Sequence, residues 1–288
     1  MTDAVDVEYD VPYAAGIDQA TLDLYRPRTA DPVPVVIYVH GGGFRVGDKR
    51  DAGETRLAPF AALGVAVASV NYRLGATGIY PAPIHDIKAA VRWLRARGRE
   101  RGLLVDRLGL WGASAGGYLA AMVALSSGDE ELEGTLGDHR NERSVVDAVI
   151  VWFAPGDMIA NSTRSPLEKL VLGPPAGTVL FGRDDIPGDD AAVRAASPVF
   201  RAHTDAPPFL ISHGDRDRIA MEMEGRALHE ALVRAGAEST FAVVGGAGHE
   251  GAEFDRPGHL ALTAAWLRAH LLRPESRGRR ASEGDRAL

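Results

Sequence analysis

The stretch LGLWGASAGGYLAAMVAL, Leu108 to Leu125, contains the strongest structural signal in the chain. It begins as an apolar strand, passes through the pattern G-x-S-x-G and continues as an apolar helix. The turn between strand and helix is so tight that only small residues fit two positions on either side of the serine, which explains Gly112 and Gly116. Ser114 is then presented at the start of a helix, where backbone amides favour negative charge. We therefore interpret Ser114 as a candidate nucleophile.

A second glycine-rich turn follows the apolar run VVIYV, which ends at His40. Three consecutive glycines, 41–43, indicate a backbone that bends sharply or comes close to a bound anion. The spacing excludes a P-loop, because Asp48 takes the place of the required lysine. It also excludes the dinucleotide pattern G-x-G-x-x-G, because Val46 stands at its last glycine. The anion expected here is instead an oxyanion formed during a reaction.

Such an oxyanion needs amide donors close to the nucleophile. We predict that the N–H groups of Gly42 and Gly43 point at a substrate carbonyl oxygen, joined by the N–H of Ala115 directly after the serine. Glycine at these positions leaves room for an acyl group. Phe44 follows the glycines and is predicted to form a wall of the substrate pocket beside that group.

Apolar β-runs and helical patterns alternate along the rest of the chain. Strands that are apolar throughout and separated by helices favour a parallel sheet with helices on both faces, an α/β fold. The first 30 residues are predicted to form two edge strands. The other predicted elements are strands at 33–40, 65–73, 106–112, 147–155, 208–214 and 239–246, and helices at 51–63, 84–97, 116–128, 221–235 and 259–272.

Two segments interrupt this alternation. Residues 157–197 are rich in proline and glycine, and we interpret them as a candidate cap over the carboxyl ends of the strands. The prolines favour a fixed loop over a mobile helix. Residues 274–288 carry mixed charge and almost no apolar side chains, as in a disordered tail. We therefore assign residues 1–273 to one domain that includes the cap segment.

The composition is that of an ordinary globular protein, with 288 residues of which 45% are hydrophobic and 25% charged. A formal net charge of -7 argues against a nucleic-acid partner, and the arginines between Arg92 and Arg101 are expected to form a solvated face. The chain contains no cysteine, which excludes disulfides and cysteine nucleophiles. No apolar run approaches the ~20 residues of a membrane span, and the N-terminus lacks the features of a signal peptide, so a cytoplasmic location is expected.

Together these motifs resemble the α/β-hydrolase esterases of the group that includes the BD-FAE-like and hormone-sensitive-lipase-like carboxylesterases. The resemblance implies an eight-stranded, mostly parallel sheet whose second strand is antiparallel, with helices on both faces and a small cap excursion. The matching sequences, between about Leu22 and His249, are LDLYRP, VHGGGF, NYRL, YPAPIHDIKAAVRWL, GASAGG, SPV, PPFLISHGDRD and GAGH.

In this fold the catalytic residues follow the chain order Ser, Asp or Glu, His, so the base lies downstream of Ser114. His249 lies in the loop GGAGHEG after the last predicted strand, where a general base can reach the serine. We therefore select His249 as the base. Structural roles are expected for the other histidines that were considered, namely His40, His213, His229, His259 and His270.

The acid is expected after the strand PFLISHG. Asp215 and Asp217 both satisfy this condition, and Asp157 follows a different strand. The H-G-x-x-D pattern of the resembling families selects Asp217. Asp215 is then expected to be a turn residue, and Asp157 to form hydrogen bonds on the cap side.

The resemblance implies a serine carboxylesterase that hydrolyses short-chain or small aryl and alkyl esters through an acyl-enzyme, with no metal or organic cofactor. An arylformamidase or exopeptidase-like hydrolase of the same fold is the alternative, since a fold does not fix a substrate. An inactive binding module is disfavoured, because all three catalytic positions hold competent residues. The expected partner is a small-molecule ester, and the oligomeric state is left open.

Overall fold

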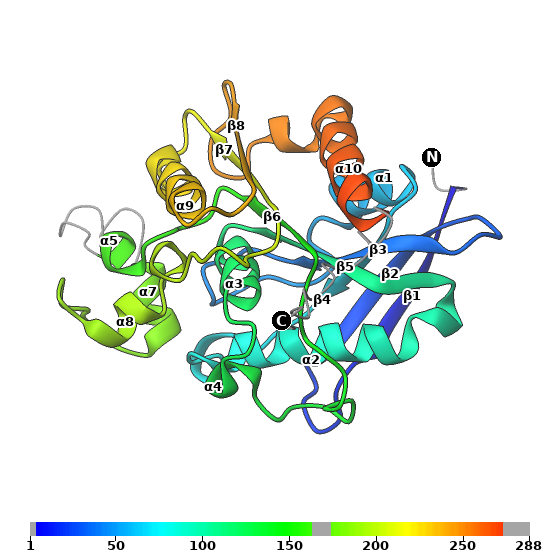
Figure 1. The fold of residues 1–288 in the computed structure, drawn as a ribbon, viewed down its shortest axis with the longest axis horizontal. Coiled ribbons are helices and arrows are strands. Elements are labelled where there is room, and N and C mark those ends of the chain that lie inside the picture. Colours follow the sequence, from blue (N-terminus) through cyan, green and yellow to red (C-terminus); the bar gives the residue numbers. More distant parts are fainter. Residues whose placement is uncertain (1–3, 163–173, 273–288) are drawn as a thin grey trace, which may run out of the picture.

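The computed structural model describes residues 4–162 and 174–272. These residues form one eight-stranded sheet with the order β1-β2-β4-β3-β5-β6-β7-β8 (Figure 1). β2 is antiparallel to both of its neighbours, and the pairs from β4 to β8 are parallel. The predicted fold class is therefore confirmed. The strands are β1 (Val5–Pro12), β2 (Thr21–Pro27), β3 (Val33–Val39), β4 (Ala66–Val70), β5 (Leu103–Ala113), β6 (Ala148–Trp152), β7 (Phe209–Gly214) and β8 (Ser239–Val244).

The N-terminal strands differ from the sequence expectation in one respect. Both are predicted to be edge strands, but β2 pairs with β1 on one side and with β4 on the other. Consecutive residues of β2, including Leu22, Leu24 and Tyr25, are buried. A strand with apolar side chains on both of its faces fits the interior of a covered sheet, whereas the more exposed β1 fits its edge.

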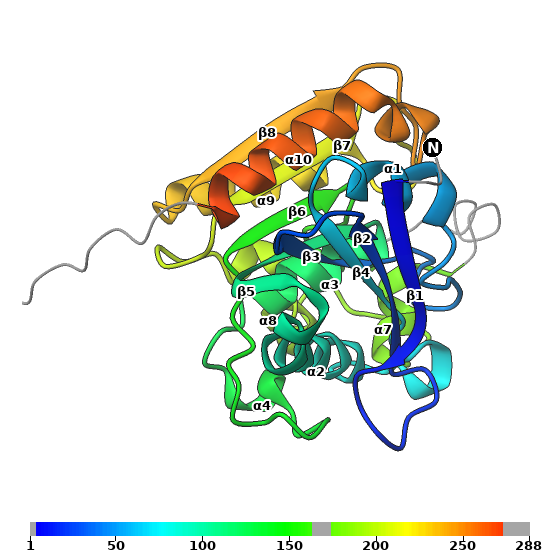
Figure 2. The ribbon, with the colours of Figure 1, turned by 90° about the vertical axis from the view of Figure 1, so that its right-hand side faces the viewer.

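Helices cover both faces of the sheet (Figures 1 and 2). α2 (Ala82–Arg97), α3 (Ala115–Ala124) and α9 (Glu222–Arg234) contribute to an apolar cluster on one face. On the other face, α1 (Ala58–Ala61) packs with α10 (Pro257–Leu271). No helix in the described part of the chain is both long and apolar enough to cross a membrane. Short helical segments are η2 (Gly53–Leu57), η3 (Gly75–Thr77), η4 (Arg99–Arg101), α4 (Glu130–Glu133), η5 (Pro198–Phe200) and η6 (Ala252–Asp255).

The helix predicted over residues 51–63 is present at 53–61 as two consecutive helical segments. η2 is a π-helical turn, and the α-helix that follows it has only four residues. Pro59, which has no N–H to donate to the preceding turn, lies where the π-helical turn passes into the α-helix, and the backbone stays helical at Leu57 and Ala58. The Arg56 side chain in η2 is buried and forms an ion pair with Asp255, near the other end of the chain.

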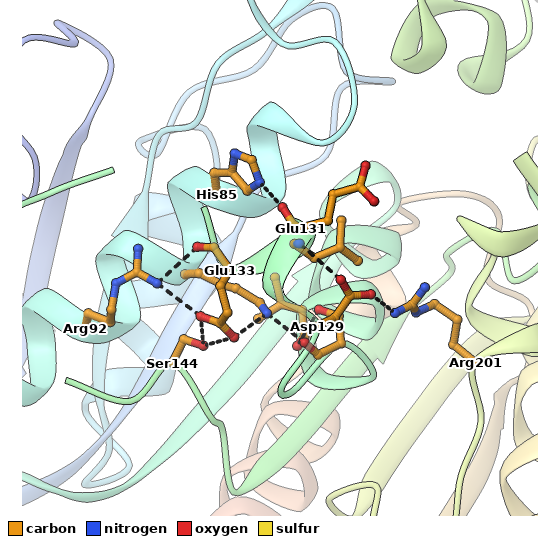
Figure 3. Close-up of polar contacts among 11 residues, drawn as sticks. His85, Arg92, Asp129, Glu131, Glu133, Ser144 and Arg201 are labelled. Carbon is orange, nitrogen blue, oxygen red and sulfur yellow. Dashed lines mark hydrogen bonds and ion pairs between the residues drawn. The ribbon is translucent and has the colours of Figure 1, made fainter. Parts of the chain in front are cut away.

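The segment between α3 and β6 is held against α2 by a polar network (Figure 3). The Glu133 carboxylate accepts hydrogen bonds from Lys88 Nζ at 2.7 Å, from Ser144 Oγ and from Arg92. Lys88 is fully buried, and its ammonium group also donates to the carbonyl of Ser126 at 2.8 Å. Burial lowers the pKa of Lys88, and the Glu133 carboxylate opposes that shift. These partners replace the water that a buried cation loses.

A second ion pair in the same region links this segment to a later part of the chain. Asp129 caps α4 by accepting from the Leu132 amide, and it binds Arg201 at 2.5 Å (Figure 3). Burial raises the pKa of Asp129, but hydrogen bonds from Arg201 and from the Leu132 amide outweigh this effect and lower that pKa. The segment between α3 and β6 is therefore attached both to α2, through Glu133, and to Arg201, through Asp129.

The prediction that the arginines between Arg92 and Arg101 form a solvated face is wrong in part. Arg92 and Arg95 are buried, and Arg95 donates to the carbonyl of Arg143 at 3.1 Å. Only Arg97 and Arg99 are exposed as predicted. A long side chain with several donors can satisfy loop carbonyls inside the protein, which a run of positive charges in the sequence does not reveal.

The described parts of the segment 157–197 form short helices rather than the predicted fixed loop. Pro175 is the N-cap residue of one of them, a position where proline removes no helical hydrogen bond. Residues 163–173 of this segment, and the predicted tail at 274–288, lie outside the described residues. The three helices are α5 (Met158–Ser162), α7 (Ala176–Phe181) and α8 (Ala191–Ala195).

The start of this segment packs on α9 through a largely buried carboxyl group. Glu224 accepts hydrogen bonds from the amide of Gly156 at 3.3 Å and from Asn161 Nδ2 at 3.4 Å. Burial raises the pKa of Glu224 to about 7, although these hydrogen bonds act against the shift. The folded protein therefore holds a proton here at pH values where the unfolded chain has released it.

We predict that Glu224 makes the free energy of unfolding fall as the pH rises from 4.5 to about 7, because the folded state binds more protons than the unfolded state in this interval. Between about pH 5 and about pH 8, Glu224→Gln should lose less stability than the unchanged protein, by on the order of 3 kcal/mol. Urea unfolding at both pH values measures this difference. Glu230→Gln, exposed on the same helix, is the control. An unchanged pH dependence in Glu224→Gln would contradict the prediction.

Candidate active site

Ser114 stands between β5, which ends at Ala113, and α3, which begins at Ala115. Its backbone has a φ of 54° and a ψ of -121°, a strained conformation for a residue with a side chain. The turn leaves no room for neighbouring side chains, since a Cβ on Gly112 would lie 2.0 Å from the carbonyl oxygen of Gly116. The strand, the turn and the helix lie where the sequence predicts them, and they present the hydroxyl group at the carboxyl edge of the sheet.

Two side chains from later loops meet Ser114. His249 Nε2 lies 2.8 Å from Ser114 Oγ, and His249 Nδ1 lies 2.7 Å from Asp217 Oδ2. Asp217 follows β7 and His249 follows β8, so all three residues come from the carboxyl ends of parallel strands. With a proton on Nδ1 donated to the carboxylate, Nε2 is free to accept the serine proton. The structure thus brings together the three residues that the sequence analysis selects.

The Asp217 carboxylate is surrounded by donors. Its Oδ1 accepts from the amides of Ile219 at 2.8 Å and Ala220 at 3.1 Å. His213 Nε2 lies 2.7 Å from the carbonyl oxygen of Ala220, so it carries a proton, and it is 3.4 Å from Asp217 Oδ2. Burial raises the pKa of Asp217, but hydrogen bonds from His213, His249 and the Ile219 amide outweigh it and hold that pKa well below its usual range. Asp217 is therefore ionised near neutral pH.

The other candidate residues have different partners. Asp215 accepts from the Gly246 amide at 2.7 Å, as expected of a turn residue, and Asp157 accepts from the Ile159 amide at the start of α5. Within residues 4–162 and 174–272, no three His, Asp or Glu side chains are arranged to hold a metal ion. The other histidines considered as candidates contact other groups: His40 the carbonyl of Gly41, His229 the hydroxyl of Ser239, His259 the rings of Trp152 and Phe254, and His270 the carboxylate of Glu238.

The glycine loop lies directly beside Ser114, because a Cβ on Gly41 would be 3.2 Å from the serine Cβ. Gly42 and Gly43 have φ values of 110° and 60°, and a Cβ on Gly42 would lie 1.9 Å from a backbone oxygen of the same loop. Among the described residues, the amides of Gly42 and Gly43 have no acceptor. The amide of Ala115 begins α3 and has none within its helix. Three backbone donors are therefore available near the serine.

Phe44 does not occupy the position that the sequence predicts. Its side chain is fully buried, and its ring packs edge-on against Tyr118 of α3 at a centroid distance of 5.6 Å. Phe44 itself has a φ of 62°, a conformation that the sequence pattern does not reveal. It belongs to the apolar core beneath the glycine loop, so it supports the loop and does not line an open pocket.

An ion pair fixes the loop that carries His249. Arg56 donates to Asp255 Oδ1 at 2.6 Å and to the Tyr38 hydroxyl at 2.7 Å, and its guanidinium lies 5.1 Å from the centre of a Trp152 ring. Asp255 ends η6, the short helix after His249. The sequence analysis missed this pair because its members lie 199 positions apart and belong to no motif. A buried arginine cannot be distinguished from a surface arginine by its neighbours in the chain alone.

Aromatic packing holds the imidazole from another direction. The Phe153 ring lies edge-on to His249 at 5.1 Å and to Phe254 at 4.6 Å between ring centres. Phe153 has a φ of 38°, which is rare for an aromatic residue, and its amide is fixed by the carbonyl of Ser212 at 2.8 Å. The position of the imidazole therefore depends on packing as well as on its hydrogen bonds.

A parallel sheet with a strained serine between strand and helix, joined at the strands' carboxyl ends by a histidine and an aspartate, defines an α/β-hydrolase. The chain belongs to the BD-FAE family, whose family model matches residues 22–232. The resemblance seen in the sequence motifs is confirmed.

Individual proteins show the same similarity. The chain is 30% identical over 232 residues to Esterase LipQ of Mycobacterium tuberculosis, covering 79% of this chain and 53% of LipQ. A truncated form of carbohydrate esterase from gut microbiota matches with a TM-score of 0.85 at 27% identity, over 95% of this chain and 99% of that one. Esterase B from Lactobacillus rhamnosis (HN001) shares the fold, with a TM-score of 0.75 at 24% identity over 93% and 85% of the two chains. The chain spans about half the length of the curated relatives it matches.

We predict that Asp217→Asn slows the reaction of Ser114 with a fluorophosphonate probe by about 10²- to 10⁴-fold, because the imidazole loses the group that orients it and stabilises its charge. Asp215→Asn, which alters only a turn, should react at nearly the normal rate. The labelling rates of the two variants, measured side by side, test the assignment. Equal small losses would place the acid elsewhere, with Asp157 the next residue to substitute.

Proposed function

We propose that this protein is a serine carboxylesterase that hydrolyses small or short-chain esters through an acyl-enzyme. The observation that carries the proposal is the hydrogen-bonded series Ser114, His249 and Asp217, with contacts of 2.8 Å and 2.7 Å, beside three available backbone amides. A nucleophile, its base, a group that orients the base and donors for a developing negative charge are the parts that acyl transfer requires.

The first half-reaction forms the acyl-enzyme. His249 Nε2 takes the proton of Ser114 while the serine Oγ attacks the carbonyl carbon of the ester. The electron pair of the carbonyl bond moves to its oxygen, which accepts hydrogen bonds from the amides of Gly42, Gly43 and Ala115. The bond to the leaving alcohol then breaks, and His249 gives its proton to the alcohol oxygen.

The second half-reaction uses the same groups in reverse. His249 takes a proton from a water molecule, whose oxygen attacks the acyl carbon. The bond between that carbon and Ser114 Oγ breaks, and the proton returns to the serine. Asp217 stays ionised throughout and supports the imidazolium that forms in each half. The products are the carboxylic acid and the regenerated serine.

The named relatives support ester hydrolysis as the reaction class. LipQ and LipC of Mycobacterium tuberculosis are both named esterases, and the structure with a TM-score of 0.85 is named a carbohydrate esterase. We take from these names the ester bond and no particular alcohol or acid, because one fold serves many substrates.

We further propose that the segment 157–197 is a cap that belongs to the domain 1–273 and limits the acyl site. Its two ends are joined, since the amide of Met158 donates to Ser197 Oγ at 3.0 Å. The Tyr118 hydroxyl of α3, the helix that begins after Ser114, donates to the carbonyl of Ala196 at 2.6 Å. A segment tied down in this way supports an acyl site of fixed, small size.

Ser114→Ala is expected to abolish both the hydrolysis of nitrophenyl acetate and labelling by a fluorophosphonate probe, because the reacting oxygen is removed. Ser127→Ala, at an exposed serine beyond α3, should retain both. Circular dichroism checks that each variant is folded. More than a trace of hydrolysis by Ser114→Ala would show that another residue is the nucleophile.

Acyl chains from acetyl to about hexanoyl should be better substrates than palmitoyl. Each added methylene gains ~0.8 kcal/mol of transfer free energy until the site is full, after which steric clash lowers the rate. Values of kcat/KM for nitrophenyl esters from acetate to palmitate measure the profile. A maximum at about twelve carbons or more, or activation at an oil–water interface, would contradict a small acyl site.

A further inference from the structure

The residue directly after His249 has an unusual backbone conformation. Glu250 has a φ of 53°, in the left-handed region that is unfavourable for a residue with a side chain. Backbone strain of this kind is concentrated at functional sites, so the surroundings of the Glu250 side chain are informative.

The Glu250 carboxylate lies beside the nucleophile. Its Oε1 is 3.4 Å from the point that a Cβ on Gly41 would occupy, and Ser114 Cβ is 3.2 Å from the same point. The side chain therefore extends from the histidine loop to the glycine loop. Burial raises the pKa of Tyr38, and the charge of Glu250 adds to that effect, which agrees with a carboxylate close enough to act on the buried Tyr38.

This carboxylate is available to a ligand. Its side chain is exposed, and it forms no hydrogen bond or ion pair with any other residue in the described ranges. The neighbouring carboxylates are occupied, since Asp217 binds His249 and Asp255 binds Arg56. Glu250 therefore differs from them in offering two oxygen acceptors beside the reacting serine.

The position of Glu250 next to the base indicates which part of a substrate it meets. His249 must deliver a proton to the leaving alcohol oxygen, so the alcohol part of the ester lies against this loop. The glycine loop also has a cation beside it, because Arg45 Nε is 4.0 Å from the point that a Cβ on Gly43 would occupy. With a cation and an anion beside the same loop, an uncharged hydroxyl group is attracted by the carboxylate without being repelled by the guanidinium.

We propose that Glu250 is a specificity-determining residue, whose carboxylate accepts a hydrogen bond from a second hydroxyl group on the alcohol part of the ester. The preferred substrates are then monoesters of diols or other polyhydroxy alcohols. This inference rests on the proposed esterase function. It adds a contact that the hydrolysis itself does not require.

The test compares two acetate esters that differ in one hydrogen-bond donor. In 2-hydroxyethyl acetate the second oxygen of the alcohol part is a hydroxyl group, which can donate a hydrogen bond. In 2-methoxyethyl acetate the same oxygen is a methyl ether, which cannot. The ratio of their kcat/KM values should fall by about 10-fold in Glu250→Ala relative to the unchanged protein, because a hydrogen bond to a charged acceptor is lost. Glu250→Gln, which keeps one neutral acceptor oxygen, should give an intermediate ratio.

A matched control is Glu253→Ala, a carboxylate in the same loop that binds Arg256. It should leave the ratio unchanged. If Glu250→Ala lowered the rates of both esters equally, Glu250 would only support the loop, and the proposal would be overturned. It would also be overturned if the variant changed only the preference for acetylcholine over uncharged 3,3-dimethylbutyl acetate, since Glu250 would then select a cation.

A failure of the proposed function itself gives a different result. The unchanged protein would then hydrolyse neither of the two acetate esters nor nitrophenyl acetate. A protein that hydrolyses all three but does not distinguish the hydroxyl ester from the ether in a Glu250-dependent way would retain the esterase function and lose only this inference.

Discussion

The absence of side chains at Gly112 and Gly116 is the constraint on which the site depends. A Cβ on Gly116 would lie 2.1 Å from the carbonyl oxygen of Val39, and one on Gly112 would lie 2.0 Å from that of Gly116. Because these two residues have no side chain, α3 can start directly against the ends of β3 and β5. It places Ser114 in a strained turn beside the glycine loop and in front of the helix amides. The same close approach therefore positions the candidate nucleophile and the backbone amides that we propose as donors to its oxyanion.

The parallel sheet supplies the common edge to which the other parts are attached. Ser114 and His249 lie 135 positions apart in the sequence, but each follows a strand whose carboxyl end is at this edge. The loop of His249 then needs its own supports, because hydrogen bonds to the imidazole do not fix its backbone. The ion pair between Arg56 and Asp255 and the packing of Phe153 supply them.

Three carboxyl groups near this edge differ in how deeply they are buried and in the hydrogen-bond donors around them. Asp217 is buried but has several donors, so it is held as an anion. Glu224 is largely buried with weaker partners, and burial raises its pKa to about 7. Glu250 is exposed and has no partner among the described residues. The surroundings of each carboxyl group, rather than the residue type, therefore explain why we assign Asp217 to orient the imidazole, expect Glu224 to titrate near neutral pH and propose Glu250 as a hydrogen-bond acceptor for substrate.

The features that follow from local sterics and periodicity can be predicted from the amino-acid sequence. These are the alternation of buried strands and helices, the turn around Ser114 and the bend at the glycines. The choice of Asp217 over Asp215 needed the family resemblance, because both residues follow the same strand. The folded structure was needed to find that Phe44 is buried, that Arg56 reaches Asp255 and that Glu250 lies beside Gly41. Such contacts join segments far apart in the chain, so no local pattern specifies them.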